Sequence, residues 1–416
     1  MTYLRFLRAE PRFLGFGFLT AFFASFGQTF FISLFSAELR EAFALSHGGF
    51  GEVYSLATLT SAALVVWLGR LIDNADLRLY TAVVCVGMSV ACLVMAGLPT
   101  GSIGFLFVAI LLLRLFGQGL LTHVSVTAMA RYFEATRGRA LAIARLGATA
   151  GEAVFPILTV TLVGFVGWRQ SWGAIGVALA IGLVPLMLWL LRGHRERHSA
   201  FLTALDGEAS DPAAALRRHW TRREVLRDAG FYLVMPFMLA QSFIGTGYFF
   251  HQVHLAESKG WSLTLFASSY GIYAAFTLAA LVLAGPLVDR LGSERLLPLV
   301  KLPLALGLLA LAAADAPAVA FVFMALMGLS AGAYGVVSSA YFAEVYGLRH
   351  LGSIRALVAA LMVLSSAGSP AVMGWLIDAG VSMERIAVAS ALYLVVATAI
   401  LPFARRARIA AAGAGA

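Results

Sequence analysis

The feature that most limits how this chain can fold is its series of long apolar segments. A helix needs about 20 mostly apolar residues to cross a bilayer. We count twelve such stretches, at residues 12–36, 48–72, 78–98, 102–133, 138–166, 170–191, 229–256, 263–288, 296–314, 317–346, 350–377 and 383–404. Only 12% of the 416 residues are charged, against roughly 25% in soluble domains. The alternating pattern of membrane barrel strands does not occur, so the sequence predicts an all-α polytopic membrane protein with twelve transmembrane helices.

The basic residues are distributed unevenly between the two sides of these segments. Of 30 Lys and Arg residues, we place two within the membrane (Arg114 and Arg145), four on one side and the remaining 24 on the other. The four are Arg40, Arg169, Lys259 and Arg385. Since basic loops stay in the cytoplasm, we predict cytoplasmic termini in a multi-pass cell membrane, most simply a bacterial inner membrane. The scatter of the basic residues disfavours nucleic-acid binding and favours contact with anionic lipid.

Two sets of residues indicate an internal duplication. Gly69 and Asp73 recur as Gly285 and Asp289 at an offset of 216, and a second set recurs at an offset of 214. The second set pairs Tyr132, Gly138 and Pro156 with Tyr346, Gly352 and Pro370. We therefore predict two six-helix pseudo-repeats, at residues 1–191 and 229–404. A cytoplasmic linker with a short surface helix, 192–228, joins them, and 405–416 form a disordered tail.

Twelve helices in two such halves resemble the major facilitator superfamily. Its Gly-x-x-x-Asp-Arg-x-Gly signature is matched by Gly285, Asp289, Arg290 and Gly292. The first copy keeps Gly69, Asp73 and Arg78, but Asn74 and Asp76 replace the basic residue and the second glycine. In physical terms, the glycines permit close helix approach. The aspartates can pair with cytoplasmic Arg residues and latch the two halves as a gating motif.

Three of the few charges that fall inside apolar segments lie between residues 114 and 156: Arg114, Arg145 and Glu152. Each costs about 2.5–3.5 kcal/mol to insert in lipid, so such groups usually face a protein interior or a water-filled cavity. Arg114 with Gln118 and Gly119 also resembles the Arg-x-x-x-Gln-Gly pattern of the superfamily, where the Arg stabilises the core or takes part in proton coupling. Two roles remain open for Arg114: a buried ion pair with Glu152, or direct binding of substrate or proton.

The stretch that follows resembles the monocarboxylate-transporter branch, including oxalate/formate antiporters. The resemblance rests on Arg131-Tyr132-Phe133 and on the helix with Gly147, Gly151 and Pro156. Gly147 and Gly151 share one helix face, which predicts tight packing against the first or eighth helix. The same spacing also resembles the fifth helix of drug exporters. The Arg that the monocarboxylate branch carries in its eighth helix is absent here, so Arg114, Arg145 or protonated His251 would have to bind an anion.

The remaining candidates are polar residues within the spans. Gln28 lies near mid-membrane and either contacts a ligand or hydrogen bonds to another helix. The second half offers hydroxyls but no mid-membrane charge. His251 and His254 are three residues apart, but no third metal ligand is evident. The predicted substrate-binding set is Gln28, Arg114, Arg145, Tyr248, His251, Tyr270, Tyr273, Tyr334 and Ser338, and the proton-coupling candidates are Glu52, Glu152 and His251.

These features favour a monomeric secondary active transporter. A phosphate-binding loop is absent, which disfavours ATP as the energy source. No nucleophile–base pair, metal cluster or cofactor motif supports an enzyme. We predict alternating-access transport of a small organic anion, similar to a monocarboxylate, coupled to protons. The alternative is proton-driven export of a metabolite or drug-like compound.

Overall fold

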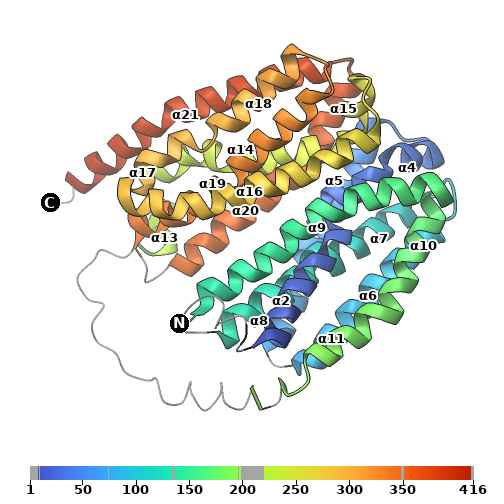
Figure 1. The fold of residues 1–416 in the computed structure, drawn as a ribbon. Helices are drawn as coiled ribbons and strands as arrows, with labels where there is room; N and C mark the ends of the chain where they lie inside the picture. Colours follow the sequence, from blue (N-terminus) through green and yellow to red (C-terminus); the bar gives the residue numbers. More distant parts are fainter. Residues whose placement is uncertain are drawn as a thin grey trace. The chain divides into compact units, whose positions relative to one another are not determined.

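The computed structural model describes residues 8, 10–73, 75–133, 136–194, 196–197, 220–347 and 351–413, and every regular element within them is helical. The chain separates into two compact units (Figure 1). The first unit comprises Met1–Leu45 and Glu52–Ala213, and the second comprises Ser46–Gly51 and Ala214–Ala416. The segment Ser46–Gly51 therefore belongs to the second unit, although the chain on both sides of it belongs to the first.

The first unit is a bundle in which α2 packs against α8 and α9, and α6 packs against α7 and α10. Short 3-10 or π-helical stretches interrupt several of its spans. Its elements are α2 (Pro11–Phe23), η1 (Ala24–Gly27), α3 (Thr29–Ile32), η2 (Ser33–Phe35), α4 (Ser36–Phe43), α5 (His47–Leu68), η3 (Gly69–Asp73), α6 (Leu77–Ala96), α7 (Ile103–Leu113), η4 (Arg114–Leu121), α8 (Thr122–Tyr132), α9 (Arg137–Val166), α10 (Trp168–Ala178), η6 (Leu179–Leu183) and α11 (Val184–Leu190).

The second unit is built on two sets of contacts: α16 and α18 pack on α19, and α14 packs on α20 and α21. Its elements are α13 (Arg222–Val225), α14 (Ala229–Phe250), α15 (Gln252–Ser258), α16 (Leu263–Leu291), α17 (Ser293–Leu296), η7 (Leu297–Leu299), α18 (Leu302–Ala313), α19 (Ala318–Tyr346), α20 (Leu351–Asp378) and α21 (Met383–Gly413).

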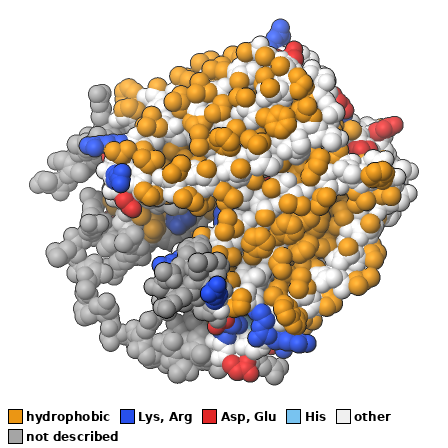
Figure 2. Space-filling view, in the orientation of Figure 1, with side chains coloured by type: hydrophobic (Ala, Val, Ile, Leu, Met, Phe, Trp, Pro, Cys, Tyr) orange, Lys and Arg blue, Asp and Glu red, His pale blue; other side chains and the backbone are white. Residues whose placement is uncertain are grey.

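The predicted helical membrane fold is confirmed. Eleven helices in the described residues are long and apolar enough to span a membrane, and a bent pair at the start of the chain makes twelve if it counts as one span. Large hydrophobic side chains lie exposed on them, such as Trp67, Phe165 and Ile181. Figure 2 shows hydrophobic side chains covering the flanks of the helices, with charged groups gathered toward their ends. Such a surface suits lipid rather than water.

Two glycines of α9 allow it to lie directly against the first span. A Cβ atom at Gly147 would overlap the carbonyl of Phe18, and one at Gly151 would overlap the Ser25 hydroxyl. Side-chain volume at either position would push the helices apart. The predicted packing of this glycine face is confirmed for the first helix.

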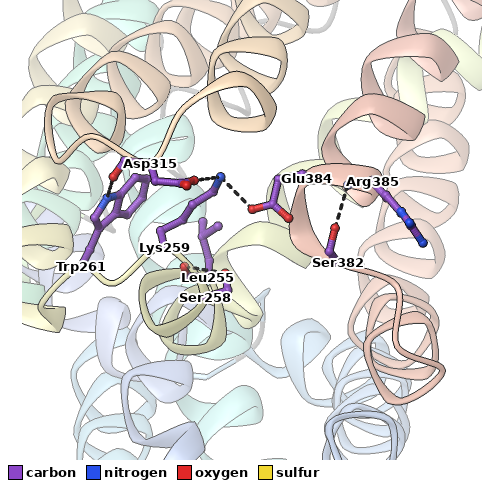
Figure 3. Close-up of polar contacts among 8 residues, drawn as sticks. All are labelled: Leu255, Ser258, Lys259, Trp261, Asp315, Ser382, Glu384 and Arg385. Carbon is purple, nitrogen blue, oxygen red and sulfur yellow. Dashed lines mark hydrogen bonds and ion pairs between the residues drawn. The ribbon is translucent and has the colours of Figure 1, made fainter.

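A buried lysine ties three polar segments of the second unit together. Lys259 follows α15, and its Nζ lies 2.6 Å from Asp315 Oδ1 and 2.7 Å from Glu384 Oε1 (Figure 3). Its side chain is only 1% exposed. Burial by itself lowers the pKa of Lys259, but hydrogen bonds to the two carboxylates outweigh that effect, so the net pKa is raised. Trp261 Nε1 also donates to the Asp315 carbonyl at 2.6 Å, which fixes the loop between α18 and α19.

The predicted tail, 405–416, and the predicted linker, 192–228, are described by the structure to different extents. α21 continues to Gly413, so residues 405–413, which we expected to be a disordered tail, are helical. The reason is composition, because Ala and Arg are among the strongest helix formers. Most of the linker with its expected surface helix lies outside the described residues, and α13 (Arg222–Val225) is the part that is described.

Candidate functional site

The first span is broken at Gln28. Pro11–Gly27 and Thr29–Phe43 meet at an angle of 45°. Gln28 takes extended backbone angles of φ −81° and ψ 154°, which interrupts the helical hydrogen-bond ladder and frees the carbonyl of Gly27 from it. A Cβ at Gly117 would lie 2.5 Å from the Gly27 Cα, so two glycines let the break and the π-helical stretch η4 touch. Discontinuous helices form substrate and ion sites in many transporters.

Arg114 compensates for this break. Its Nη1 donates to the Gly27 carbonyl at 3.0 Å and lies 3.4 Å from Thr29 Oγ1. The guanidinium also lies over the ring of Tyr54, 5.2 Å from its centroid, and the Tyr54 hydroxyl donates to Thr29 at 2.8 Å. Arg114 is 3% exposed. The break and the arginine therefore form one polar cluster inside the first unit.

The ion pair between Arg114 and Glu152 that we considered is not formed. No carboxylate lies within 4 Å of Arg114 in the described part of the chain, and its buried Nε has no hydrogen-bond partner. Glu152, on α9, has a buried Oε2 that also lacks a partner. Arg114 therefore has no countercharge within 4 Å among the described residues, whereas Glu152 has no ion pair there but lies close enough to Arg145 to feel its charge. A buried charge without a close partner is costly unless a ligand or a proton neutralises it.

The other charged candidates of the first half are exposed. Arg145 lies two helical turns before Glu152 on α9 and is exposed within the candidate span Arg137–Val166. Glu52 is exposed in the first turns of α5. An exposed arginine within a span is better placed in a water-filled path than in lipid.

In the second unit, the predicted tyrosines Tyr270 and Tyr273 of α16 pack against residues at the end of α14 and the start of α15. Tyr270 donates to Gln252 Oε1 at 2.8 Å, and Phe249 stacks on Tyr270 and meets Tyr273 edge to face. Tyr248 is buried against Phe323. These side chains are therefore engaged with one another and with their neighbours.

The histidine of the predicted set is buried beside other histidines. His251 is 3% exposed and its Nε2 lies 3.0 Å from the Pro370 carbonyl, so this nitrogen carries a proton. The His47 ring lies 5.9 Å from that of His251 and 4.4 Å from that of His254. Even so, no group of three potential metal-ligating side chains converges within the described residues.

Sequence reasoning missed a buried cation in the second half. Lys301, which we had counted with the cytoplasmic residues, is 1% exposed and lies within the candidate span Ser293–Ala313. Its Nζ donates to Gln241 Oε1 at 2.8 Å and lies 3.6 Å from the centroid of the Tyr334 ring. The expectation of no mid-membrane charge in this half is therefore wrong. The available signal was a single Lys between apolar runs, in Leu-Val-Lys-Leu-Pro-Leu.

Tyr334 and Ser338 lie one turn apart on α19. The Tyr334 hydroxyl donates to the Met238 carbonyl at 2.8 Å, so it is already engaged. Ser338 is half-buried. Of this pair, Ser338 is therefore the more accessible to a solute.

The two copies of the gating motif end their helices differently. Gly292 ends α16 with φ +78°, a conformation that favours glycine. Asp76, at the equivalent place in the first copy, instead caps α6 by accepting a hydrogen bond from the Arg78 amide at 2.7 Å. The departure from the signature is thus a change of capping chemistry.

The remaining motif residues differ in how closely they are packed. The Gly69 carbonyl lies 3.0 Å from His123 Nε2, and a Cβ at Gly69 would lie 3.3 Å from that nitrogen. A Cβ at Gly285 would meet nothing within 4 Å, so the expected close helix approach is not seen there. Asp289 and Arg290 are exposed at the end of α16, and the Asp73 side chain lies outside the described residues.

The structure combines two bundles of membrane-length helices, one span that is broken at its middle, and charged groups held inside. These are features of a polytopic membrane transporter. The family comparison is consistent with this class: the Major Facilitator Superfamily model matches residues 17–312 and 237–413. The chain belongs to this superfamily, and it is a secondary transporter rather than an enzyme.

Solved structures agree on the fold. A bacterial homolog of the human lysosomal transporter Spinster, inward-facing and unoccupied, aligns over 96% of this chain and 97% of its own, with a TM-score of 0.69 and 14% identity. Its occupied form aligns at 16% identity, TM-score 0.69, over 95% and 96% of the two chains. The nucleoside transporter NupG aligns at 14% identity, TM-score 0.69, over 95% and 98%. No curated protein matches the sequence.

Proposed function

We propose that the protein moves a small organic anion, similar to a monocarboxylate, across the cell membrane in symport with protons. The proposal rests on one observation: Arg114 is buried in the first unit without a carboxylate within 4 Å among the described residues. A cation held this way is stabilised when an anion binds near it. Gln28, at the break next to Arg114, would add a hydrogen-bonding group, and exposed Arg145 would attract the anion along a water-filled path.

Proton coupling is assigned to Glu152. A buried carboxyl oxygen without a donor favours the protonated form. Binding of a proton here and of an anion near Arg114 would neutralise both groups before the transporter changes conformation. His251 and Glu52 remain secondary proton-coupling candidates, and the gating-motif residues would act on the conformational change itself. We place both termini in the cytoplasm.

The test is uptake of labelled carboxylates into proteoliposomes, with and without an imposed proton gradient. We expect uptake to depend on the gradient and to fall about tenfold in Arg145→Gln, the lower end of the effect expected when a charge that attracts the substrate is lost. Glu152→Gln should abolish gradient-driven accumulation but retain exchange of labelled for unlabelled substrate. Equal gradient-driven uptake by Glu152→Gln and the wild type would contradict the coupling role.

Proton-driven export of a metabolite or drug-like compound is the second candidate, and one observation favours it. A cavity of about 380 Å³ in the second unit is lined mainly by apolar side chains of α14, α20 and α21, including Leu239, Phe243, Val372, Met373 and Ile386. A cationic dye therefore accompanies the carboxylates in the assay. Dye movement driven by the proton gradient, with no carboxylate flux, would overturn the anion proposal.

A further inference from the structure

The buried Lys301 of the second unit has an unusual set of partners. Its ammonium group meets one amide oxygen, on Gln241 of α14, and the faces of two aromatic rings. The rings belong to Tyr334 and Phe237, with centroids 3.6 and 5.7 Å from Nζ. Among the described residues Lys301 has no ion pair. The only polar side-chain atom that receives a hydrogen bond from it is therefore Gln241 Oε1.

This contact fixes the orientation of the Gln241 amide. An ammonium group can only donate hydrogen bonds, so the amide oxygen must face Lys301 and the NH2 group must face away. The Ser330 hydroxyl lies 3.3 Å from the same oxygen and donates to the Val300 carbonyl at 2.7 Å. With one strong donor and a second nearby on the oxygen, a flipped amide would place its NH2 against the ammonium group.

The amide nitrogen is left as an accessible donor. Gln241 Nε2 donates no hydrogen bond within the described residues. Gln241 is half-buried, and Nε2 is not among the buried polar atoms that lack a partner. One turn along α14, Gly245 leaves space beside it: a Cβ there would lie 3.9 Å from Nε2 and 3.4 Å from Met327 Cε.

We propose that Gln241 is a substrate-binding residue whose NH2 group donates to a carboxylate or carbonyl oxygen of the transported solute, and that Lys301 positions and polarises it. Donation to the amide oxygen strengthens donation by the amide nitrogen. The charge of Lys301 thus acts on the ligand through Gln241 without contact. This inference depends on the proposed transport of an organic anion and adds a ligand contact in the second unit.

Three substitutions test the inference with little disturbance of the fold. Gln241→Glu keeps an acceptor for Lys301 and strengthens that contact, but presents a carboxylate oxygen to the ligand in place of NH2. Gly245→Ala places a methyl group beside Nε2 at an ordinary contact distance, in a helix that favours Ala. Lys301→Met removes the positioning charge, and Ser330→Ala is the matched control that leaves the Lys301 contact in place.

The experiment measures KM and Vmax for carboxylate uptake in proteoliposomes, together with carboxylate-dependent thermal stabilisation of the purified variants. For Gln241→Glu we expect the KM for carboxylate to rise about 10- to 100-fold, since a hydrogen bond to a charged group is lost and repulsion replaces it. Gly245→Ala and Lys301→Met should raise KM roughly tenfold with Vmax per folded protein kept. Ser330→Ala should change KM less than threefold.

The results separate the two proposals. A wild type that neither transports nor is stabilised by any carboxylate overturns the anion proposal itself. A wild type that transports carboxylate, with unchanged KM in folded Gln241→Glu and Gly245→Ala, overturns only the role of Gln241. Lys301→Met bears on positioning: if Gln241→Glu raises KM but a folded Lys301→Met does not, the positioning role is overturned. Should Lys301→Met fail to fold, Lys301→Gln is used, where loss of the charge should again raise KM roughly tenfold; an unchanged KM in folded Lys301→Gln overturns the positioning role.

Discussion

At the scale of single residues, the buried charges differ in how they are neutralised. Lys259 has two carboxylates, whereas Arg114 and Lys301 have only neutral partners: carbonyl, amide, hydroxyl and ring groups. A paired charge stabilises the native geometry, but an unpaired buried charge costs free energy that a structural residue of neutral type would avoid. We therefore assign Lys259 to stability, and this difference fits the roles proposed above, ligand binding for Arg114 and positioning of Gln241 for Lys301.

Replacing Lys259 should lower stability without changing substrate affinity. Lys259→Met leaves Asp315 and Glu384 without their cation, and because Asp315 is 73% exposed, water can replace much of the lost contact. We expect a loss of about 1–2 kcal/mol, between the values for surface and buried ion pairs. Arg385→Gln, an exposed position in the same turn of α21, is the control. Thermal unfolding followed by tryptophan fluorescence measures both.

The raised pKa of Lys259 also predicts how this loss varies with pH. A group whose pKa is higher in the folded state stabilises fully below its unfolded pKa, here 10.5, and loses that effect only as pH rises through the folded value. The stability difference between wild type and Lys259→Met should thus stay constant from pH 6 to 9. A difference that shrinks by half across this range would contradict the assignment.

A residue of the site could be predicted from the sequence only where the sequence also indicated that its side chain is buried. Arg114 and Glu152 lie deep in apolar runs, so their depth was predictable. Lys301 stands only a few residues beyond the charged stretch Asp289–Arg295, and hydropathy alone does not show that its side chain turns inward. The absence of the Arg114–Glu152 pair was equally out of reach, because hydropathy does not fix the rotation of a helix.

At the scale of elements, helix contacts depend on small residues and on breaks. The sequence predicted the packing face of α9 because its glycines are spaced one helical turn apart. The break at Gln28 was not, because Ala-Ser-Phe-Gly-Gln-Thr contains no proline and reads as continuous helix. It exists because Arg114, 86 residues later, satisfies the carbonyl that the break frees. Tertiary contacts thus override local helix propensity here.

The α2–α9 contact gives a prediction with a control on the same helix. Gly147→Leu should abolish folded protein or lower the unfolding temperature sharply, because its Cβ would overlap the Phe18 carbonyl and a backbone atom cannot move aside. Gly164→Leu, where a Cβ meets nothing within 4 Å, should leave stability unchanged. Monodispersity in size-exclusion chromatography and thermal unfolding provide the readout, and equal behaviour of the two variants would contradict the packing account.

At the scale of the whole molecule, the sequence predicted the class of fold because both the apolar spans and their duplication are written in residue types. The sequence did not predict that Ser46–Gly51 belongs to the second unit. Asp378, at the end of α20, holds this segment in the second unit: it accepts hydrogen bonds from the amides of His47 at 3.0 Å and Gly48 at 2.8 Å. Glycine at position 48 permits the approach, because a Cβ there would lie 2.5 Å from the Trp375 ring.

The place of Ser46–Gly51 in the second unit predicts how the protein behaves when its chain is cut into two fragments. Cutting between residues 200 and 215 severs no contact of the described residues, so co-expressed fragments 1–205 and 206–416 should associate and retain uptake. Fragment 206–416 alone should be less stable than in the complex, since Asp378 then loses two backbone donors worth about 1 kcal/mol each.

In the co-expressed pair, Asp378→Ala should reproduce part of that loss, while Asp289→Ala, exposed at the end of α16, should not. Protease resistance of the second fragment, with and without its partner, measures the effect. Equal resistance in both states would mean that Ser46–Gly51 adds nothing to the stability of the second unit.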